Sequence, residues 1–193
     1  MTTTTLTAVQ DQRIRDTLPN TNPGDSDLAV SKGSHDRRSL IEFDLSSIPT
    51  SGVVFSSVTL RLYCLNVENT NSITVSAFRV VRNWLESQVT WNIATTGDSW
   101  GTAGCENTST DRSGTNAGSV AITTGSAWYE ISFNTSEFES MLSNNEGLIL
   151  IVTGGADNSY KTFHSSEFGA NPPELVIEYT PGGGQDAQAV WFG

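Results

Sequence analysis

Residue types that commonly carry catalysis are scarce in this sequence. The 193 residues include two histidines, His35 and His164, and two cysteines, Cys64 and Cys105. Nucleophilic catalysis needs a serine or cysteine held beside a histidine base, and the spacing of these residues does not differ from chance. The run His164-Ser165-Ser166-Glu167 has suitable side chains but no recognisable motif. We therefore expect no enzymatic activity.

The carboxylates suggest glycoside hydrolysis or cation binding. Hydrolysis needs two carboxylates across a cleft, and among the 21 Asp and Glu residues no pair stands out. Calcium takes carboxylate and amide oxygens from turns, but the turn candidates lack the spacing of a known calcium loop. Asx turns, in which such side chains bond their own backbone, are the simpler interpretation. We expect no cofactor, with a structural calcium left open at Asn20, Asn22, Asp25 and Asp27.

Aromatic rings in loops suggest glycan binding, because such rings stack on sugars while polar groups orient the hydroxyls. Trp100 and Tyr160 lie in predicted loops and are the candidates for this role. Arg112, near Trp100 in sequence, would assist them, although a solvated loop charge is the plainer interpretation of Arg112. These residues predict a glycan site built on loops.

The C-terminal tail from residue 181 to 193 is a Gly-rich linker that ends in the apolar tip Val190-Trp191-Phe192. Such a tip can insert into a neighbour's groove or add a strand to its sheet edge. The alternative is a tail that folds back on its own domain or frays. We expect this tail and the polar arm Thr2 to Thr5 to contact partner proteins in a homo-oligomer or larger assembly.

Charge and cysteine content narrow the class of partner. The formal net charge of −11 disfavours nucleic acid and acidic polysaccharides, because it repels polyanions. The start MTTTTLTAVQ has neither the basic nor the apolar region of a signal peptide, and no apolar run is long enough to span a membrane. Two cysteines do not form a disulfide framework. We expect two free thiols, a buried one at Cys64 and an incidental one at Cys105, rather than a disulfide between them.

Alternating apolar and polar residues predict the strands that position these groups. Val58, Leu60, Leu62 and Cys64 fall on one face of a strand, while the pattern around Phe78 slips as in a bulge. The continuous run at 148–152 predicts a strand covered on both faces. Strands are predicted at residues 6–15, 26–32, 37–44, 56–65, 73–80, 128–133, 148–152 and 174–179.

Three segments depart from the strand pattern. Residues 83–92 predict a turn that places two tryptophans in the core, and residues 95–125 predict a long loop with a short strand at 119–122. A capping box that begins at Ser136 predicts the only helix. Together these elements predict one all-β domain at 1–180, an antiparallel jelly-roll-like β-sandwich with one short helix, followed by the tail.

Five stretches, in this order, give the sequence its resemblance to a known family. It resembles the DNRLRE-type β-sandwich domain, which is grouped with family 96 of the carbohydrate-binding modules. The resemblance implies a non-catalytic jelly-roll-like scaffold. It also implies that Trp84, Trp91 and Trp128 belong to the core and that the run ending at Glu167 is structural. The stretches are PNTNPG (19–24), RRSLIEFDL (37–45), VTLRLY (58–63), WLESQVTWN (84–92) and PELVIEY (173–179).

These observations lead to three functional hypotheses. The first is a non-catalytic virion surface protein, such as a bacteriophage head decoration protein, that is held in its assembly by the terminal arms and can bind host-surface glycans. The second is a carbohydrate-binding module of a secreted polysaccharide-degrading enzyme or cell-surface adhesin. The third is a minor pilus adhesin. In all three, Arg38, Asp44 and Arg61 are expected to form ion pairs in the framework.

Overall fold

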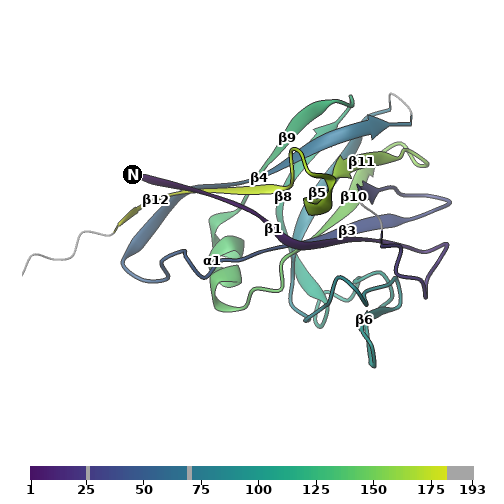
Figure 1. Cartoon of the computed structure of the whole chain (residues 1–193), viewed down its shortest axis with the longest axis horizontal. Coiled ribbons are helices and arrows are strands. Elements are labelled where there is room, and N and C mark those ends of the chain that lie inside the picture. Colours follow the sequence, from purple (N-terminus) through teal and green to yellow (C-terminus); the bar gives the residue numbers. More distant parts are fainter. Residues whose placement is uncertain (25–26, 69–70, 182–193) are drawn as a thin grey trace, which may run out of the picture.

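The computed structural model describes residues 1–24, 27–68 and 71–181. Ten of its strands form two antiparallel sheets that share one strand and pack face to face, and two short strands form a separate ladder (Figure 1). This confirms the predicted all-β sandwich with one short helix. No helix in this part of the chain has the length and apolarity needed to cross a membrane. The elements are β1 (Thr2–Arg15), β2 (Asp27–Val30), β3 (Arg37–Phe43), β4 (Val53–Val67), β5 (Ile73–Val80), β6 (Ile93–Thr95), β7 (Asp98–Ser99), β8 (Arg112–Ile122), β9 (Ala127–Ser132), α1 (Thr135–Ser143), β10 (Leu148–Gly155), β11 (Lys161–His164), η1 (Ser166–Phe168) and β12 (Glu174–Pro181).

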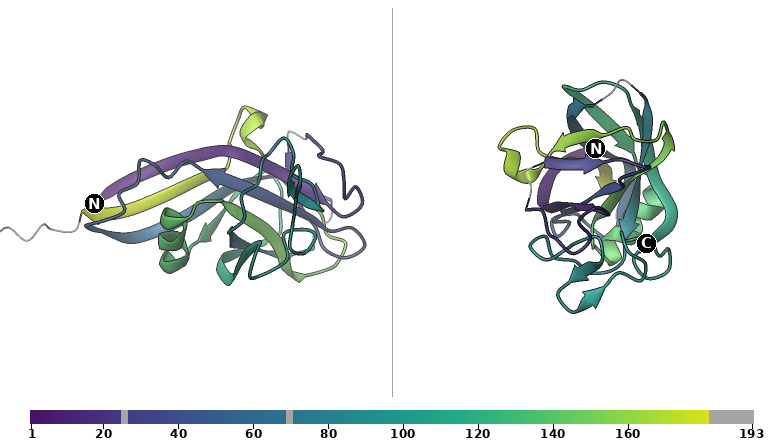
Figure 2. Two further views of the ribbon diagram at one scale, coloured as in Figure 1. Left: turned by 90° about the horizontal axis from the view of Figure 1, so that it is seen from below. Right: turned by 90° about the vertical axis from the view of Figure 1, so that its right-hand side faces the viewer.

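Strand β1 belongs to both sheets. Its first half pairs with β12, with Thr2 opposite Tyr179, and its second half pairs with β3 after a bulge that follows Ala8. The arm Thr2 to Thr5, expected to contact a partner protein, therefore pairs within its own chain. Figure 2 (left) shows β1, β12 and the start of β4 extending side by side to the end of the molecule where the N-terminus lies.

The two sheets share β1 and differ in their other members. The first contains β2, β11, β4 and β12, with β9 on the second edge of β4. The second contains β3, β10, β5 and β8. Between them lies the main core, which includes the predicted face of β4, and Leu60, Leu62 and Cys64 are inaccessible to solvent.

A second apolar core lies on the outer face of the second sheet. Leu40 and Ile149 are buried there against Trp84, Trp100 and Cys105. In β3, Leu40 is apolar and buried although its neighbours Ser39 and Ile41 face the other side of the sheet, and this second layer explains its burial. The second layer also confirms that the run 148–152 is covered on both faces. The stretch from Trp84 to Cys105, which carries Trp84 and Trp100, covers this face of the sheet.

The segment predicted as a long loop is more ordered than expected. It contains the last residue of β6, all of β7 and all of β8, which begins at Arg112 rather than at residue 119. The buried carboxylate of Asp111 accepts hydrogen bonds from the backbone N–H groups of Gly101 (2.7 Å), Thr102 (3.0 Å) and Asn107 (3.2 Å). Hydrogen bonding to one carboxylate therefore orders a stretch that lacks apolar periodicity.

The structure also bears on predictions about the bulge at Phe78, the start of the helix and strand β11. The bulge at Phe78 is confirmed by register shifts on both sides of that residue. The helix begins one residue before Ser136, because the N-cap is Asn134, whose side chain accepts from the backbone N–H of Ser136 (3.1 Å). Strand β11, which carries His164, was not predicted as a strand.

Cys64 and Cys105 are both buried and free, so Cys105 is a core residue rather than incidental.

The predicted framework ion pairs form for two of the three residues. Arg38 pairs with Glu106, and Arg61 pairs with Glu130 at 3.3 Å. Asp44 does not follow this prediction, because it is exposed and accepts a hydrogen bond from the backbone N–H of Ser46 (2.9 Å). Asp44 therefore closes a local turn.

Candidate functional site

Trp100 and Arg112, two of the three predicted glycan contacts, are built into the protein interior. Trp100 is 5% exposed, and its indole N–H donates to the carbonyl oxygen of Thr90 (3.0 Å). Arg112 is 8% exposed, pairs with Glu106 (2.9 Å) and lies over the ring of Phe78. Neither offers a free face to a sugar, because the segment around Trp100 folds back onto the second sheet.

Tyr160, the third predicted contact, is half-buried near the surface. Its hydroxyl accepts from the guanidinium of Arg13 (2.8 Å), and Arg37 lies 4.5 Å from the centre of its ring. It lines a hollow of about 140 Å³ with His35 and Glu68. That volume is small for a sugar ring with its hydroxyls, so Tyr160 alone does not make a glycan site.

The predicted calcium ligands of the 20–27 segment have separate partners. The amide oxygen of Asn20 accepts from Asn92 (2.8 Å), and Asp27 lies 3.7 Å from Arg13. The side-chain oxygen of Asn22 accepts from the backbone N–H of Gly24 (3.1 Å), which is the expected Asx interaction. Asp25 lies outside the described residues, as do Val190, Trp191 and Phe192 of the tail.

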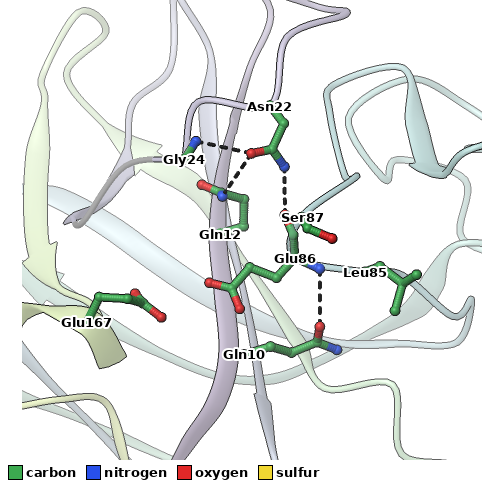
Figure 3. Close-up of a pocket in the computed structure, with 8 residues that line it drawn as sticks. All are labelled: Gln10, Gln12, Asn22, Gly24, Leu85, Glu86, Ser87 and Glu167. Carbon is green, nitrogen blue, oxygen red and sulfur yellow. Dashed lines mark hydrogen bonds between the residues drawn. The ribbon is translucent and has the colours of Figure 1, made fainter.

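A larger pocket lies where β1, the 19–24 turn, the 83–92 segment and η1 meet (Figure 3). Its volume is about 510 Å³, which is within the range of small-ligand sites. Alternation along β1 places Gln10 and Gln12 on one face. The lining residues are Gln10, Gln12, Asn22, Gly24, Leu85, Glu86, Ser87 and Glu167.

Hydrogen bonds fix the polar wall of this pocket. The backbone N–H of Glu86 donates to the side-chain oxygen of Gln10 (3.1 Å), and the Gln12 amide donates to Asn22 (3.3 Å). The Asn22 amide in turn donates to the carbonyl oxygen of Glu86 (2.6 Å). Amide groups held in this way can bind hydroxyl groups with little loss of side-chain entropy.

Three carboxylates meet beside the pocket. Asp11, Glu86 and Glu167 each offer an oxygen, and these oxygens lie within 4.8 Å of one another. Asp11 is 1% exposed, whereas Glu86 and Glu167 reach the pocket, and in Figure 3 the last two side chains extend toward each other. The backbone N–H of Ser166 donates to Asp11 Oδ2 (2.8 Å), so the start of η1 holds Asp11 in place.

Burial and mutual repulsion change the pKa values of this cluster. Burial raises the pKa of Asp11 to about 7, and the charges of Glu167 and Glu86 add to the increase. Burial also raises the pKa of Glu86, with a further contribution from Glu167. Burial opposes ionisation of Glu167 as well, but hydrogen bonds from Ser166 and Ser165 outweigh it and lower the pKa. The cluster therefore favours a bound proton or cation.

No Lys or Arg forms an ion pair with Asp11, Glu86 or Glu167 within residues 1–24, 27–68 and 71–181. The pocket is therefore electronegative. It suits neutral or cationic ligands that donate hydrogen bonds, and it disfavours anions.

A row of aromatic rings crosses the outer face of the first sheet. Tyr63 faces away from the core and lies 5.5 Å from the Trp128 ring, and His164 lies 4.8 Å away on its other side. Phe168 stacks on His164 at 3.7 Å and directly follows the pocket residue Glu167. Trp128 is half-buried on this face beneath Arg61, so the prediction that it belongs to the core is wrong.

Of the other motif tryptophans, Trp84 is inaccessible to solvent, whereas Trp91 is partly exposed beneath Arg38. The sequence analysis did not identify the pocket residues as a site. One available signal was the pair Gln10 and Gln12, which puts polar groups on a strand face that continues to buried Ile14. Another was Glu86, which lies between two tryptophans in a segment expected to enter the core.

The family comparison supports the resemblance noted above. The model of carbohydrate-binding module family 96 matches residues 2–110, which include β1 to β7, Asp11 and Glu86 but not Glu167. A comparison with curated protein sequences gives no match. Since the family model covers more than half of the chain, this protein belongs to carbohydrate-binding module family 96.

Proposed function

We propose that this domain is a non-catalytic glycan-binding module and that the pocket formed by β1, the 83–92 segment and η1 binds the sugar. The observation that carries the proposal is the convergence of fixed amide and carboxylate groups in a pocket of about 510 Å³. Planar groups of this kind bind neighbouring hydroxyls, and the match to a family of carbohydrate-binding modules supports binding rather than catalysis.

Apolar surface at the pocket complements its polar wall. Leu85 lines the pocket and is 42% exposed. Phe168, which is 41% exposed, directly follows the pocket residue Glu167 in sequence. Sugar rings combine apolar C–H faces with polar edges, so a mixed surface of this kind suits them. The aromatic row beyond Phe168 would extend the surface for a longer chain.

Electrostatics define the class of glycan. The pocket presents Glu86 and Glu167, and the whole chain has a net charge of −11. We therefore expect neutral or amino sugars and expect uronate polymers to be excluded.

A glycan array tests the proposal on the full chain, followed by titration of any sugar that binds. Ser87→Trp fills the pocket from an exposed position, and Leu85→Ala removes its apolar wall. We expect the first to abolish binding and the second to weaken it roughly tenfold. Ser56→Trp, on the exposed part of β4, is the matched control. Absence of binding to any sugar, or equal binding by Ser87→Trp and the control, would overturn the proposal.

We further propose that this glycan-binding module is displayed on a virion surface. The proposal is supported by the arrangement of the chain ends, because Thr2 pairs with Tyr179 and both ends of the described chain lie at one end of the molecule (Figure 1). Met1 and Val54, which are 80% and 63% exposed, lie at the same end. An anchor there leaves the pocket free.

Deletion of Gly182–Gly193 tests the display proposal by recovery of the protein in purified particles. Loss from the particles, with the isolated domain still folded, is the expected result. Unchanged incorporation would contradict an anchoring role for the tail and would favour the alternative, a module attached to a secreted polysaccharide-degrading enzyme or an adhesin.

A further inference from the structure

We propose that Asp11, Glu86 and Glu167 form a calcium-binding site at the edge of the pocket. Each contributes a carboxylate oxygen, and the three oxygens lie within 4.8 Å of one another. They come from β1, the 83–92 segment and η1, so one ion would join three parts of the chain that are far apart in sequence. The site is separate from the 20–27 turn in which the sequence suggested calcium ligands.

Oxygen chemistry and distance favour calcium. Three carboxylates without histidine or cysteine form a hard donor set. Calcium–oxygen bonds of about 2.3–2.6 Å allow two ligand atoms of one ion to lie up to roughly 5 Å apart. Magnesium, with bonds of about 2.0–2.1 Å and a strict octahedral shell, would require a tighter and more regular arrangement. Water entering from the pocket would complete the shell.

An unsatisfied oxygen independently points to a ligand. Asp11 Oδ1 is buried and accepts no hydrogen bond from any residue that the structure describes. The other oxygen of the same carboxylate accepts from Ser166, so the side chain is held while Oδ1 lacks a partner. A buried carboxylate oxygen in this state is costly. A bound cation would satisfy it.

The charge of the cluster supports the same assignment. The buried carboxylate of Asp11 lies close to those of Glu86 and Glu167, with oxygens of all three within 4.8 Å of one another. No Lys or Arg forms an ion pair with the three carboxylates in the described ranges. A divalent ion would offset this repulsion, whereas a single proton offsets it only in part.

The test uses the full chain, freed of metal with a chelator and titrated with calcium chloride by isothermal calorimetry at about pH 8, well above the usual pKa values of carboxyl groups. We expect one calcium ion per chain and a rise in melting temperature with calcium. Glu86→Gln and Glu167→Gln should each weaken calcium binding by at least roughly tenfold. Magnesium chloride, titrated in parallel, should bind more weakly.

Glu139→Gln, an exposed residue of α1, is the matched control and should bind calcium as the wild type does. The two pocket variants remove one charge from a repulsive cluster, so they should fold, which circular dichroism checks. If one does not fold, the other decides the outcome. Absence of calcium binding by the folded wild type, or equal binding by all variants, would overturn the proposal. Glycan binding is not needed for any of these measurements, so failure of one proposal does not hide failure of the other.

Discussion

The side-chain amide of Asn22 donates a hydrogen bond to the backbone carbonyl oxygen of Val89, at 2.9 Å. The same amide donates to the carbonyl oxygen of Glu86, so one residue of the 19–24 turn holds the backbone of the 83–92 segment. Two stretches of the family pattern, PNTNPG and WLESQVTWN, are thereby connected, and their junction supports one wall of the pocket.

Replacement of Asn22 by alanine should therefore destabilise the protein by about 1–3 kcal/mol, because two backbone carbonyl groups lose their side-chain donor. Urea unfolding followed by tryptophan fluorescence measures the change. Asn20→Ala is the matched control, since Asn20 makes one exposed side-chain hydrogen bond, to Asn92, and should cost clearly less. Equal effects of the two substitutions would contradict the role assigned to Asn22.

Asp11 should make stability fall as pH rises in metal-free solution. Its pKa is raised from 3.8 to about 7, so between these values the folded chain holds a proton that the unfolded chain has released. The favourable contribution of the bound proton is present at low pH and is lost as pH rises through about 7. Asp11→Asn should remove this dependence and be more stable than the wild type at about pH 8, by on the order of 1–4 kcal/mol.

Urea unfolding of both proteins between about pH 4 and pH 8 measures this difference. Asp157→Asn serves as the control, because the Asp157 side chain is 62% exposed and its substitution should leave the slope unchanged. Parallel curves for wild type and Asp11→Asn would show that Asp11 titrates normally.

Trp100→Ala should lower stability rather than remove a sugar contact. The side chain is buried in the second core and donates a hydrogen bond to Thr90, so its loss should cost about 3–5 kcal/mol. Thermal unfolding measures this cost, and Leu85→Ala, at an exposed position, should change the melting temperature little. A folded Trp100→Ala protein with a normal melting temperature and no glycan binding would restore the original prediction for this residue.

Both cysteines should be unreactive in the native protein. Burial raises the pKa of Cys64 to about 11 and also raises the pKa of Cys105, and both thiols are free. A thiol reagent such as Ellman's reagent should detect neither thiol in native protein and both in denaturant. Rapid reaction of the native protein would contradict the burial, and no reaction after unfolding would indicate a disulfide.

The fold could be predicted from the sequence wherever burial imposes a period. Alternation identified β4, and the continuous run at residues 148–152 correctly indicated β10 covered on both sides. Prediction failed where hydrogen bonds rather than apolar contacts order the chain. The carboxylate of Asp111 arranges the turns before β8, and an edge strand rich in glycine and polar residues shows little periodicity.

The candidate pocket was harder to predict because three separated segments build it. Nothing in the spacing of Asp11, Glu86 and Glu167 indicates that they meet, since only the tertiary fold brings them together. The expectation that Trp100 lies exposed in a loop failed for a different reason. The glycine- and serine-rich surroundings of this residue resemble an exposed loop, yet that loop folds onto the second sheet and buries the ring.

The shared strand β1 also has a mechanical consequence. Its first residues pair with β12 at the end of the molecule that bears the chain ends, and Gln10 and Gln12 further along it line the pocket. Tension between a ligand in the pocket and an anchor at the N-terminus would run along this strand. Ladder hydrogen bonds lie across the strand direction, so they would be sheared together rather than peeled apart one at a time. A module anchored in this way should resist flow better than the strength of any single contact implies.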